Sequence, residues 1–227
     1  MYSLSSVTEG RRSMAIPSVT KNPVVMVVDD DVSIRESLEL LVRSEGWEPI
    51  LFASAQDYLA YVPDGRPGCM ILDVNMPGLD GLDLQQRLSS SGSKVPIVFI
   101  SGFGDVPITV RALKGGACDF LTKPVDPLAL LDAIKSALFQ SEAIQREEHE
   151  LQQLQQRYRS LSRREREVME RVVAGLLNKQ VAYELSISEI TVKAHRGQVM
   201  RKMDARSLPD LVNMAALLNA GRRNDAH

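Results

Sequence analysis

The sequence has few cysteines, few aromatic residues and no long hydrophobic run. Its two cysteines, Cys69 and Cys118, are too few for a disulfide framework or a cysteine-based zinc site, and each adjoins an apolar run that predicts a small buried side chain. No apolar stretch reaches the roughly 18 residues needed to cross a bilayer. Residues 1–22 are polar and lack a signal core. We therefore expect a cytoplasmic protein without a membrane partner, and a disordered tail at 1–22.

Net charge is also small, at -2 over 227 residues, but the charge is unevenly distributed. Residues 161–227 contain 12 Lys and Arg against 8 Asp and Glu, whereas the remainder contains 15 against 21. The length allows two modest domains. The asymmetry predicts an acidic domain followed by a basic domain that binds a polyanion.

Short apolar runs alternate with helical patterns in the first part of the chain. The runs predict five buried strands, at 23–28, 47–52, 69–72, 96–100 and 118–121. Each strand is followed by a helical pattern. This alternation predicts an α/β fold, a doubly wound five-stranded parallel sheet with helices on both faces.

Polar side chains stand at the carboxyl ends of four predicted strands, where open α/β sheets build their sites. They are Asp29, Asp30, Asp73, Ser101 and Lys123. A helix cap or turn is the alternative role for a lone strand-end aspartate, and the grouping favours a site. Three carboxylates in one crevice repel one another unless a cation compensates them, and Mg²⁺ prefers oxygen ligands. A carboxylate beside Mg²⁺ can attack a phosphoryl group, while Lys123 and Ser101 bind its oxygens.

The strand ends carry motifs that resemble the receiver domain of two-component response regulators, which has a flavodoxin-like fold. Within residues 23–140 the motifs are Val28-Asp29-Asp30, Leu72-Asp73-Val74-Asn75-Met76-Pro77-Gly78, Ile100-Ser101-Gly102 and Leu121-Thr122-Lys123-Pro124. The resemblance implies that a sensor histidine kinase phosphorylates Asp73 and that Lys123 precedes a cis peptide bond. It also implies that Asp30, Asp73 and the backbone carbonyl of Asn75 hold Mg²⁺, while Asp29 acts mainly through water.

The resemblance further implies a conformational switch. Ser101 would move toward the phosphoryl oxygens, and an aromatic side chain on the fifth strand would turn inward behind it. Phe120 occupies that position, where many members have tyrosine, and an ordinary core aromatic is the alternative. The expected surface for homodimer formation on phosphorylation covers residues 106–121.

Residues 141–160 read as a helical linker rich in Glu, Gln and Arg, continuous with a helix that begins near Asp126. Apolar residues recur at nearly heptad spacing, at Ile144, Leu151, Leu154, Tyr158 and Leu161. This pattern leaves two alternatives open, a solvated helix and a short dimeric coiled coil.

Residues 161–220 predict an all-α domain of four helices, followed by a tail at 221–227. Ser162 opens a capping box and Gly175 ends that helix. A short helix at 178–185 is joined by a tight turn to a basic helix that Ser188 caps and that ends near Met203. A fourth helix is expected at 207–218. Two helices joined by a tight turn, the second basic, predict a helix-turn-helix.

This segment resembles the LuxR-type DNA-binding domain. The motifs are Leu161-Ser162-Arg163-Arg164-Glu165, Gly175-Leu176-Leu177-Asn178-Lys179-Gln180-Val181-Ala182 and Ile187-Ser188-Glu189-Ile190-Thr191-Val192-Lys193-Ala194-His195. The whole chain is similar to FixJ/NarL-type transcriptional regulators, which implies double-stranded DNA as a partner and an activator that contacts RNA polymerase. Serine or threonine is common in the family at the position of Leu177, and leucine has no hydroxyl to offer. We therefore expect Asn178 to cap the helix that follows.

The basic helix and its surroundings divide by chemistry. Lys193, Ala194 and Arg196 are expected to meet base edges in the major groove. The residues expected to contact phosphates are Asn178, Lys179, Thr191, Arg201 and Lys202. For any single Lys or Arg, a solvated charge is the alternative.

The preferred function is a phosphorylation-controlled transcription factor and not an enzyme. A phosphohydrolase is the first alternative, but Asn75 stands where aspartate-nucleophile phosphatases place a second carboxylate. An RNA-binding output domain is the second. It needs aromatic side chains for base stacking, and from residue 161 onward the sequence has only Tyr183.

Overall fold

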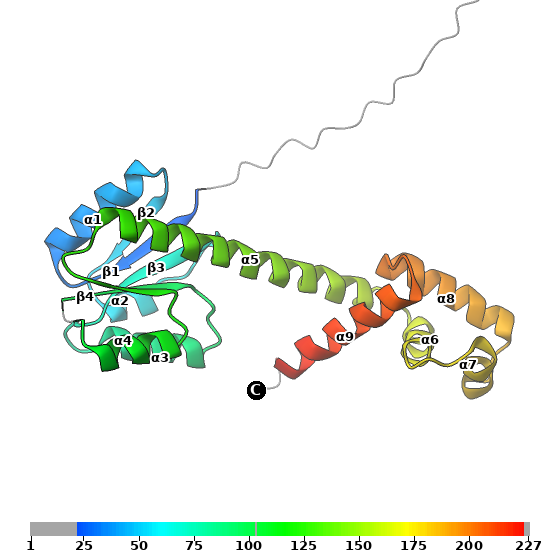
Figure 1. The fold of residues 1–227 in the computed structure, drawn as a ribbon. Helices are drawn as coiled ribbons and strands as arrows, with labels where there is room; N and C mark the ends of the chain where they lie inside the picture. The colour runs from blue at the N-terminus through cyan, green and yellow to red at the C-terminus, as the bar shows by residue number, and fades with distance from the viewer. Residues whose placement is uncertain (1–21, 103, 225–227) are drawn as a thin grey trace, which may run out of the picture. The chain divides into compact units, whose positions relative to one another are not determined.

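The structure is a computed structural model that describes residues 22–102 and 104–224, with side chains to residue 220. The predicted disordered tail lies outside these residues, apart from Asn22. The chain divides into two compact units between Ser141 and Glu142 (Figure 1). Among the described residues, no helix combines the length and apolar character needed to span a membrane.

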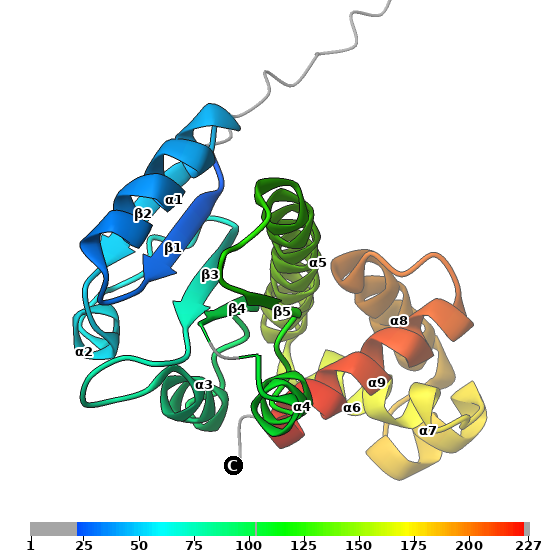
Figure 2. The same ribbon diagram turned by 60° about the vertical axis from the view of Figure 1, so that its left-hand side comes forward.

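The first unit is built on a parallel sheet of five strands in the order β2-β1-β3-β4-β5 (Figure 2). The strands are β1 (Val24–Val28), β2 (Glu48–Phe52), β3 (Gly68–Asp73), β4 (Ile97–Ser101) and β5 (Asp119–Thr122). The helices are α1 (Val32–Ser44), α2 (Ala55–Leu59), α3 (Gly81–Ser90), α4 (Val106–Lys114) and the first part of α5 (Pro127–Arg159). The predicted α/β fold is confirmed, with strand ends shifted by one residue.

Helices cover both faces of the sheet because its strands are apolar on both sides. Successive strand residues point to opposite faces, so the neighbours Ile71 and Leu72 enter different cores. Leu72 packs with Phe99 of β4 and Leu84 of α3 in the core that also includes α2. Ile71 packs in the second core, with residues of α1 and with Ile134 of α5.

The second unit consists of the end of α5 with α6 (Arg163–Val173), α7 (Asn178–Leu185), α8 (Glu189–Met203) and α9 (Leu208–Asn224). Val168, Val192 and Leu211 contribute to its single core from three different helices. A tight turn joins α7 to α8, with Ser186 at φ 53°. Helix α9 extends beyond the expected end at Leu218 into the stretch expected as a tail.

Most helix starts follow the local signals. Asp31 caps α1 by accepting from the Ser33 N–H at 2.8 Å, and Ser162 forms the predicted reciprocal capping box with Glu165. The Ser188 hydroxyl accepts from the Thr191 N–H at the start of α8. The expectation for α7 was wrong, because its cap is Leu177 and its helical residues begin at Asn178.

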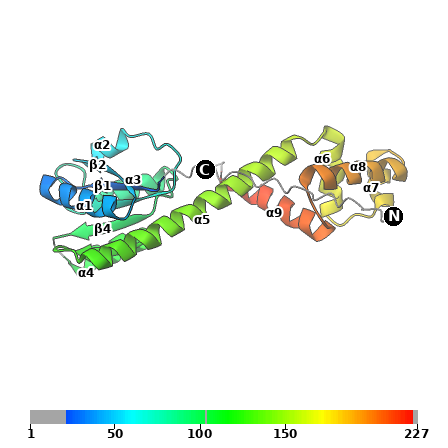
Figure 3. The ribbon, with the colours of Figure 1, turned by 90° about the horizontal axis from the view of Figure 1, so that it is seen from above.

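Helix α5 is continuous from Pro127 to Arg159, as the sequence indicates (Figure 3). Its last turns belong to the core of the second unit, where Leu154 is buried and Tyr158 is partly buried beside Leu161. These three side chains are therefore used within their own unit. A coiled coil through them would have to displace this packing, and the helix is not a wholly solvated linker.

Candidate functional site

The sheet brings the predicted site residues to one edge. Strands β1 and β3 are adjacent and in register, so Asp29, directly after β1, lies level with Asp73 at the end of β3. Ser101 ends β4, and Lys123 directly follows β5. This is the carboxyl edge at the β1/β3 position, where the strand order reverses and open sheets bind ligands.

Three carboxylates gather there. Asp29, Asp30 and Asp73 each place one oxygen within 4.8 Å of the others. Asp29 and Asp73 are buried, whereas Asp30 is exposed. Such hard oxygen donors, with more negative charge than one ammonium can balance, fit a divalent cation such as Mg²⁺.

Lys123 supplies the facing ammonium. Its Nζ lies 2.7 Å from Asp29 Oδ2 and 2.9 Å from Asp73 Oδ1. Its backbone N–H donates to the carbonyl of Ser101 at 2.7 Å, and the Lys123–Pro124 peptide is cis, as the resemblance implied. Burial lowers the pKa of Lys123, but the two carboxylates outweigh burial and hold that pKa above its ordinary value. The amine therefore stays charged between them.

The acidity of Asp73 reflects its crowded surroundings. Burial raises the pKa of Asp73, the hydrogen bond and charge of Lys123 lower it, and Asp29 and Asp30 raise it again. The net direction is upward from the ordinary value. One ammonium therefore does not fully compensate the carboxylates, and a bound cation would favour the ionised form of Asp73.

Asn75 and Ser101 complete the surroundings of Asp73. The Asn75 N–H donates to Asp73 Oδ2 at 3.1 Å, and Asn75 Nδ2 donates to Ser101 Oγ at 3.4 Å. Ser101 is fully buried. Phe120 is half-buried in the core beneath, with its ring centre 6.2 Å from that of Phe99. All the predicted receiver residues thus lie at or below this one edge.

Gly81 is a residue of this site that the sequence reasoning did not assign. A Cβ at Gly81 would lie 2.2 Å from the backbone oxygen of Asp73, and the Gly81 N–H donates to the Val74 carbonyl at 3.0 Å. Only glycine lets α3 begin this close to the end of β3. The available signal was a glycine directly after the helix-capping Asp80.

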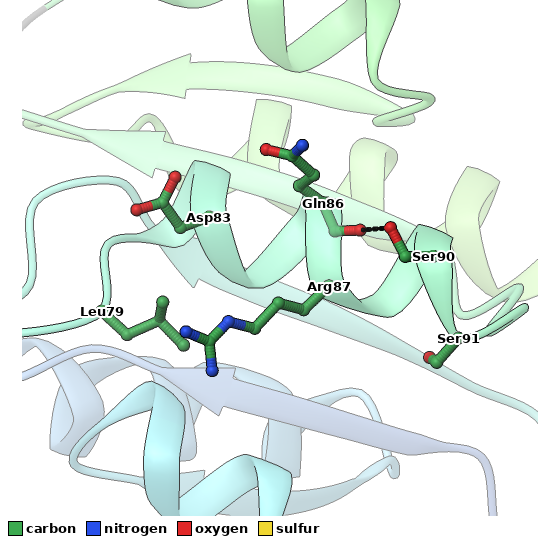
Figure 4. Close-up of a pocket in the computed structure, with 6 residues that line it drawn as sticks. All are labelled: Leu79, Asp83, Gln86, Arg87, Ser90 and Ser91. Carbon is green, nitrogen blue, oxygen red and sulfur yellow. Dashed lines mark hydrogen bonds between the residues drawn. The ribbon is translucent and has the colours of Figure 1, made fainter.

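An open hollow of about 560 Å³ lies on the outer side of α3. Its lining comes from α3, the loop before it and the residue that follows its last turn (Figure 4): Leu79, Asp83, Gln86, Arg87, Ser90 and Ser91. The carboxyl edge of the sheet that carries Asp29, Asp30 and Asp73 is called the acidic edge below. None of these three residues lines the hollow. The Ser90 hydroxyl is bonded to the Gln86 carbonyl at 2.8 Å, within the helix itself.

In the second unit, α8 buries one side and exposes the other. Val192, Val199 and Met203 are buried in the core. The exposed face of α8 consists of Glu189, Ile190, Lys193, Ala194, Gly197, Gln198 and Arg201. It includes two of the predicted base contacts and one of the predicted phosphate contacts.

Other predicted DNA contacts have partners inside the unit. Arg196 is half-buried, and its guanidinium donates to Asn178 Oδ1 at 3.1 Å. Lys202 Nζ lies 2.7 Å from Oε2 of the buried Glu165. The cap expected from Asn178 is replaced by Gln180 Oε1, which accepts from the backbone N–H of Leu177 at 2.8 Å. Leucine has no side-chain acceptor, so the capping side chain comes from the following turn.

Two remaining predicted phosphate contacts lie at helix starts. Lys179 is exposed in the first turn of α7. Thr191 is half-buried in the first turn of α8, with its hydroxyl 2.8 Å from that of Ser188. Backbone N–H groups at helix starts favour anions, which suits both positions to phosphate binding.

The fold and the acidic edge define a receiver joined to a helical DNA-binding domain, and comparison with known proteins agrees. The response regulator receiver domain matches residues 25–135, and the luxR family of bacterial regulatory proteins matches residues 159–215. The chain therefore belongs to the response regulators that carry a LuxR-type DNA-binding domain, the FixJ-like transcription regulators.

Similar full-length proteins support this assignment. The chain is 47% identical over 195 residues to nodulation protein W of Bradyrhizobium diazoefficiens, covering 86% of each chain. It is 44% identical over 201 residues to the transcriptional regulatory protein FixJ of the same species, covering 88% of this chain and 97% of FixJ. The solved structure of response regulator StyR aligns with a TM-score of 0.76 at 44% identity, covering 86% and 98%. The crystal structure of full-length FixJ from B. japonicum aligns with a TM-score of 0.53 at 43% identity, covering 88% of this chain and 99% of FixJ.

Proposed function

We propose that phosphorylation of Asp73 by a sensor histidine kinase drives homodimer formation and sequence-specific DNA binding, and that the protein activates transcription. One observation carries the first step. The Asp73 carboxylate stands at a strand end, 2.9 Å from the Lys123 ammonium and within 4.8 Å of two further carboxylates.

The chemistry is an in-line transfer. An Asp73 oxygen forms a bond to phosphorus as the bond from phosphorus to the donor's imidazole nitrogen breaks, which gives an acyl phosphate. Lys123 can turn from the carboxylates to a phosphoryl oxygen, and the Ser101 hydroxyl can donate to another. Asp29, Asp30, Asp73 and the Asn75 carbonyl would hold Mg²⁺, which supplies positive charge to the phosphoryl oxygens when bound.

Dimer formation is proposed at α4. Val106, Val110 and Leu113 recur at helical spacing, and all three are exposed, Val106 by 72%. An apolar stripe of this kind on a surface helix is typical of a face that a partner covers. Movement of Ser101 and Phe120 on phosphorylation would change the position of α4 relative to β5. The proposed partner is a second copy of this chain.

The test is phosphorylation of the full-length protein by acetyl phosphate with Mg²⁺. Wild type should be labelled and should sediment as a dimer, whereas Asp73→Asn should do neither. Asp105→Asn is the matched control, because Asp105 precedes α4 but makes no side-chain capping bond. Equal labelling of wild type and Asp73→Asn would remove Asp73 from the mechanism.

The activator step has a separate test. Purified RNA polymerase should produce more transcript from a bound promoter when phosphorylated wild type is added, and Asp73→Asn should add nothing. A fall in transcript would make the protein a repressor. Steady release of phosphate from small phosphate esters would instead support the enzyme alternative.

A further inference from the structure

We propose that Ile190 determines DNA specificity by contacting the C5 methyl group of a thymine in the major groove. This inference rests on the proposed function, in which the exposed face of α8 enters the groove. It adds a base contact that the sequence reasoning did not predict. The site contacted is one thymine in each half of a two-fold symmetric operator.

Ile190 is exposed where base contacts are made. It is the second residue of α8, just after the Ser188 cap, and it is 80% exposed. In helix-turn-helix domains, the N-terminal residues of the second helix reach the base edges. The side of α8 that carries Val192 and Val199 is buried, and Ile190 stands on the opposite side.

Its neighbours on this face leave room for close approach. Ala194 follows Ile190 by four residues and Gly197 by seven, so the three lie in one row along the helix. Neither Ala194 nor Gly197 has a polar side-chain atom. Beyond Ile190 the row therefore carries only small, apolar residues, which allows the helix to lie deep in a groove.

The surrounding charges indicate DNA and not a protein as the occupant. On the exposed face of α8, Lys193 lies beside this row and Arg201 continues it, with Glu189 as the one acidic side chain there, and Lys179 is exposed at the start of α7. These cations suit phosphates on either side of the groove.

The chemistry at the start of α8 selects the methyl group. The hydroxyls of Ser188 and Thr191, close to Ile190 in the sequence, bond to each other at 2.8 Å, whereas Glu189 and Lys193 are exposed in the same turn. Ile190 itself offers only an apolar β-branched side chain. Thymine C5 methyl is the apolar group that base edges present in the major groove. Contact between the two removes both from water.

The experiment compares thymine with deoxyuridine, which lacks only this methyl group. The preferred duplex is first selected from random sequences by full-length protein phosphorylated with acetyl phosphate. Each thymine is then replaced singly by deoxyuridine, and the affinity is measured by titration. Wild type should lose about fourfold at one position per half-site, the value expected for burying one methyl group. Ile190→Ala should bind the thymine duplex several-fold more weakly and show no preference for thymine there.

Further variants separate the outcomes. Ile190→Thr keeps one γ-methyl group and replaces the other branch by a hydroxyl, so its preference for thymine should be smaller than that of wild type. Leu40→Ala, at an exposed leucine of α1 in the other unit, should bind as wild type. The proposal is overturned if Ile190→Ala keeps the wild-type ratio at every position, or if no methyl group matters to wild type. If Lys193→Ala and Arg201→Ala also bind as wild type, the exposed face of α8 does not enter the groove, and the proposed mode of DNA binding fails together with the role of Ile190.

Discussion

Lys202 offers a sharp test, because the sequence predicts a phosphate contact and the structure gives it a partner inside the protein. Its Nζ lies 2.7 Å from Glu165 Oε2, and it donates to the Ser160 carbonyl at 3.3 Å. These contacts tie α8 to the start of α6. We expect Lys202→Met to destabilise the second unit while leaving the number of phosphate contacts unchanged.

The magnitude follows from burial. Removing one partner of a fully buried ion pair costs about 3–5 kcal/mol. Here the Glu165 side chain is 8% exposed and that of Lys202 is 32% exposed. Glu165 Oε2 also keeps the hydrogen bond from the Ser162 N–H at 2.6 Å. Because solvent screens the lysine and one donor remains, we expect a loss of about 2 kcal/mol.

Two measurements distinguish the roles. Amide hydrogen exchange in α8 of the full-length protein reports local and global opening, and Lys202→Met should accelerate it. The slope of log affinity against log salt reports phosphate contacts, and Lys202→Met should leave it unchanged. Arg201→Met is the control, because Arg201 lies on the exposed face of α8, and it should reduce the slope by about one. A Lys202→Met variant with unchanged exchange and a slope reduced by one would refute this reasoning.

Three further predictions test packing and charge. Gly197→Ala should stabilise the second unit by up to about 1 kcal/mol in urea unfolding, because a Cβ there meets nothing within 4 Å. It should also weaken DNA binding, because the added methyl group fills the row two turns beyond Ile190; tighter binding would contradict this prediction. Phe99→Ala should lower the free energy of unfolding of the first unit by about 3–5 kcal/mol, because Phe99 is fully buried. Unfolding can be monitored by the fluorescence of Trp47, the only tryptophan in the sequence, and a loss below about 1 kcal/mol would contradict the buried position. Burial raises the pKa of Glu165, but the bonds from Lys202 and Ser162 outweigh burial and lower that pKa in the folded protein. The ionised Glu165 carboxylate therefore stabilises the fold at pH values above its ordinary pKa of about 4.5, and this stabilisation is lost as pH falls through the lower pKa of the folded state. Acid titration of α8 exchange should show this loss in wild type and less of it in Lys202→Met.

The acidic edge could be predicted from sequence because parallel strands carry their polar termini to one place. Asp29, Asp73 and Lys123 each follow a short apolar run, and the alternation with helices determines that the ends of these runs meet. The contacts between the side chains could not be predicted in this way. Asn75 reaches Ser101 across 26 positions, and Lys123 bonds to both Asp29 and Asp73. Those contacts depend on rotamers and burial that no single segment determines.

The Glu165–Lys202 pair shows the same limit in the second unit. The capping box at Ser162 was predictable because its two members are three residues apart. The partner on α8 lies 37 positions away, and only the packing of α6 on α8 brings it near. A local motif was thus predicted correctly, and its second role was not.

The buried and exposed faces of α8 could, by contrast, also have been assigned from the sequence for Arg196 and Ile190. Val192, Val199 and Met203 are separated by seven and four residues, the spacing of one helix side. At about 100° per residue, Arg196 falls about 40° from Val192, on the buried side, whereas Ile190 falls about 160° away. Arg196 was predicted as a base contact because arginine is well suited to bind guanine, although this periodicity places it on the buried side. The structure agrees with the periodicity, since Arg196 is half-buried beside Asn178 and Ile190 is exposed. For a recognition helix, the buried side should therefore be determined first from the spacing of its apolar residues, and base contacts should be assigned only among the residues on the opposite side.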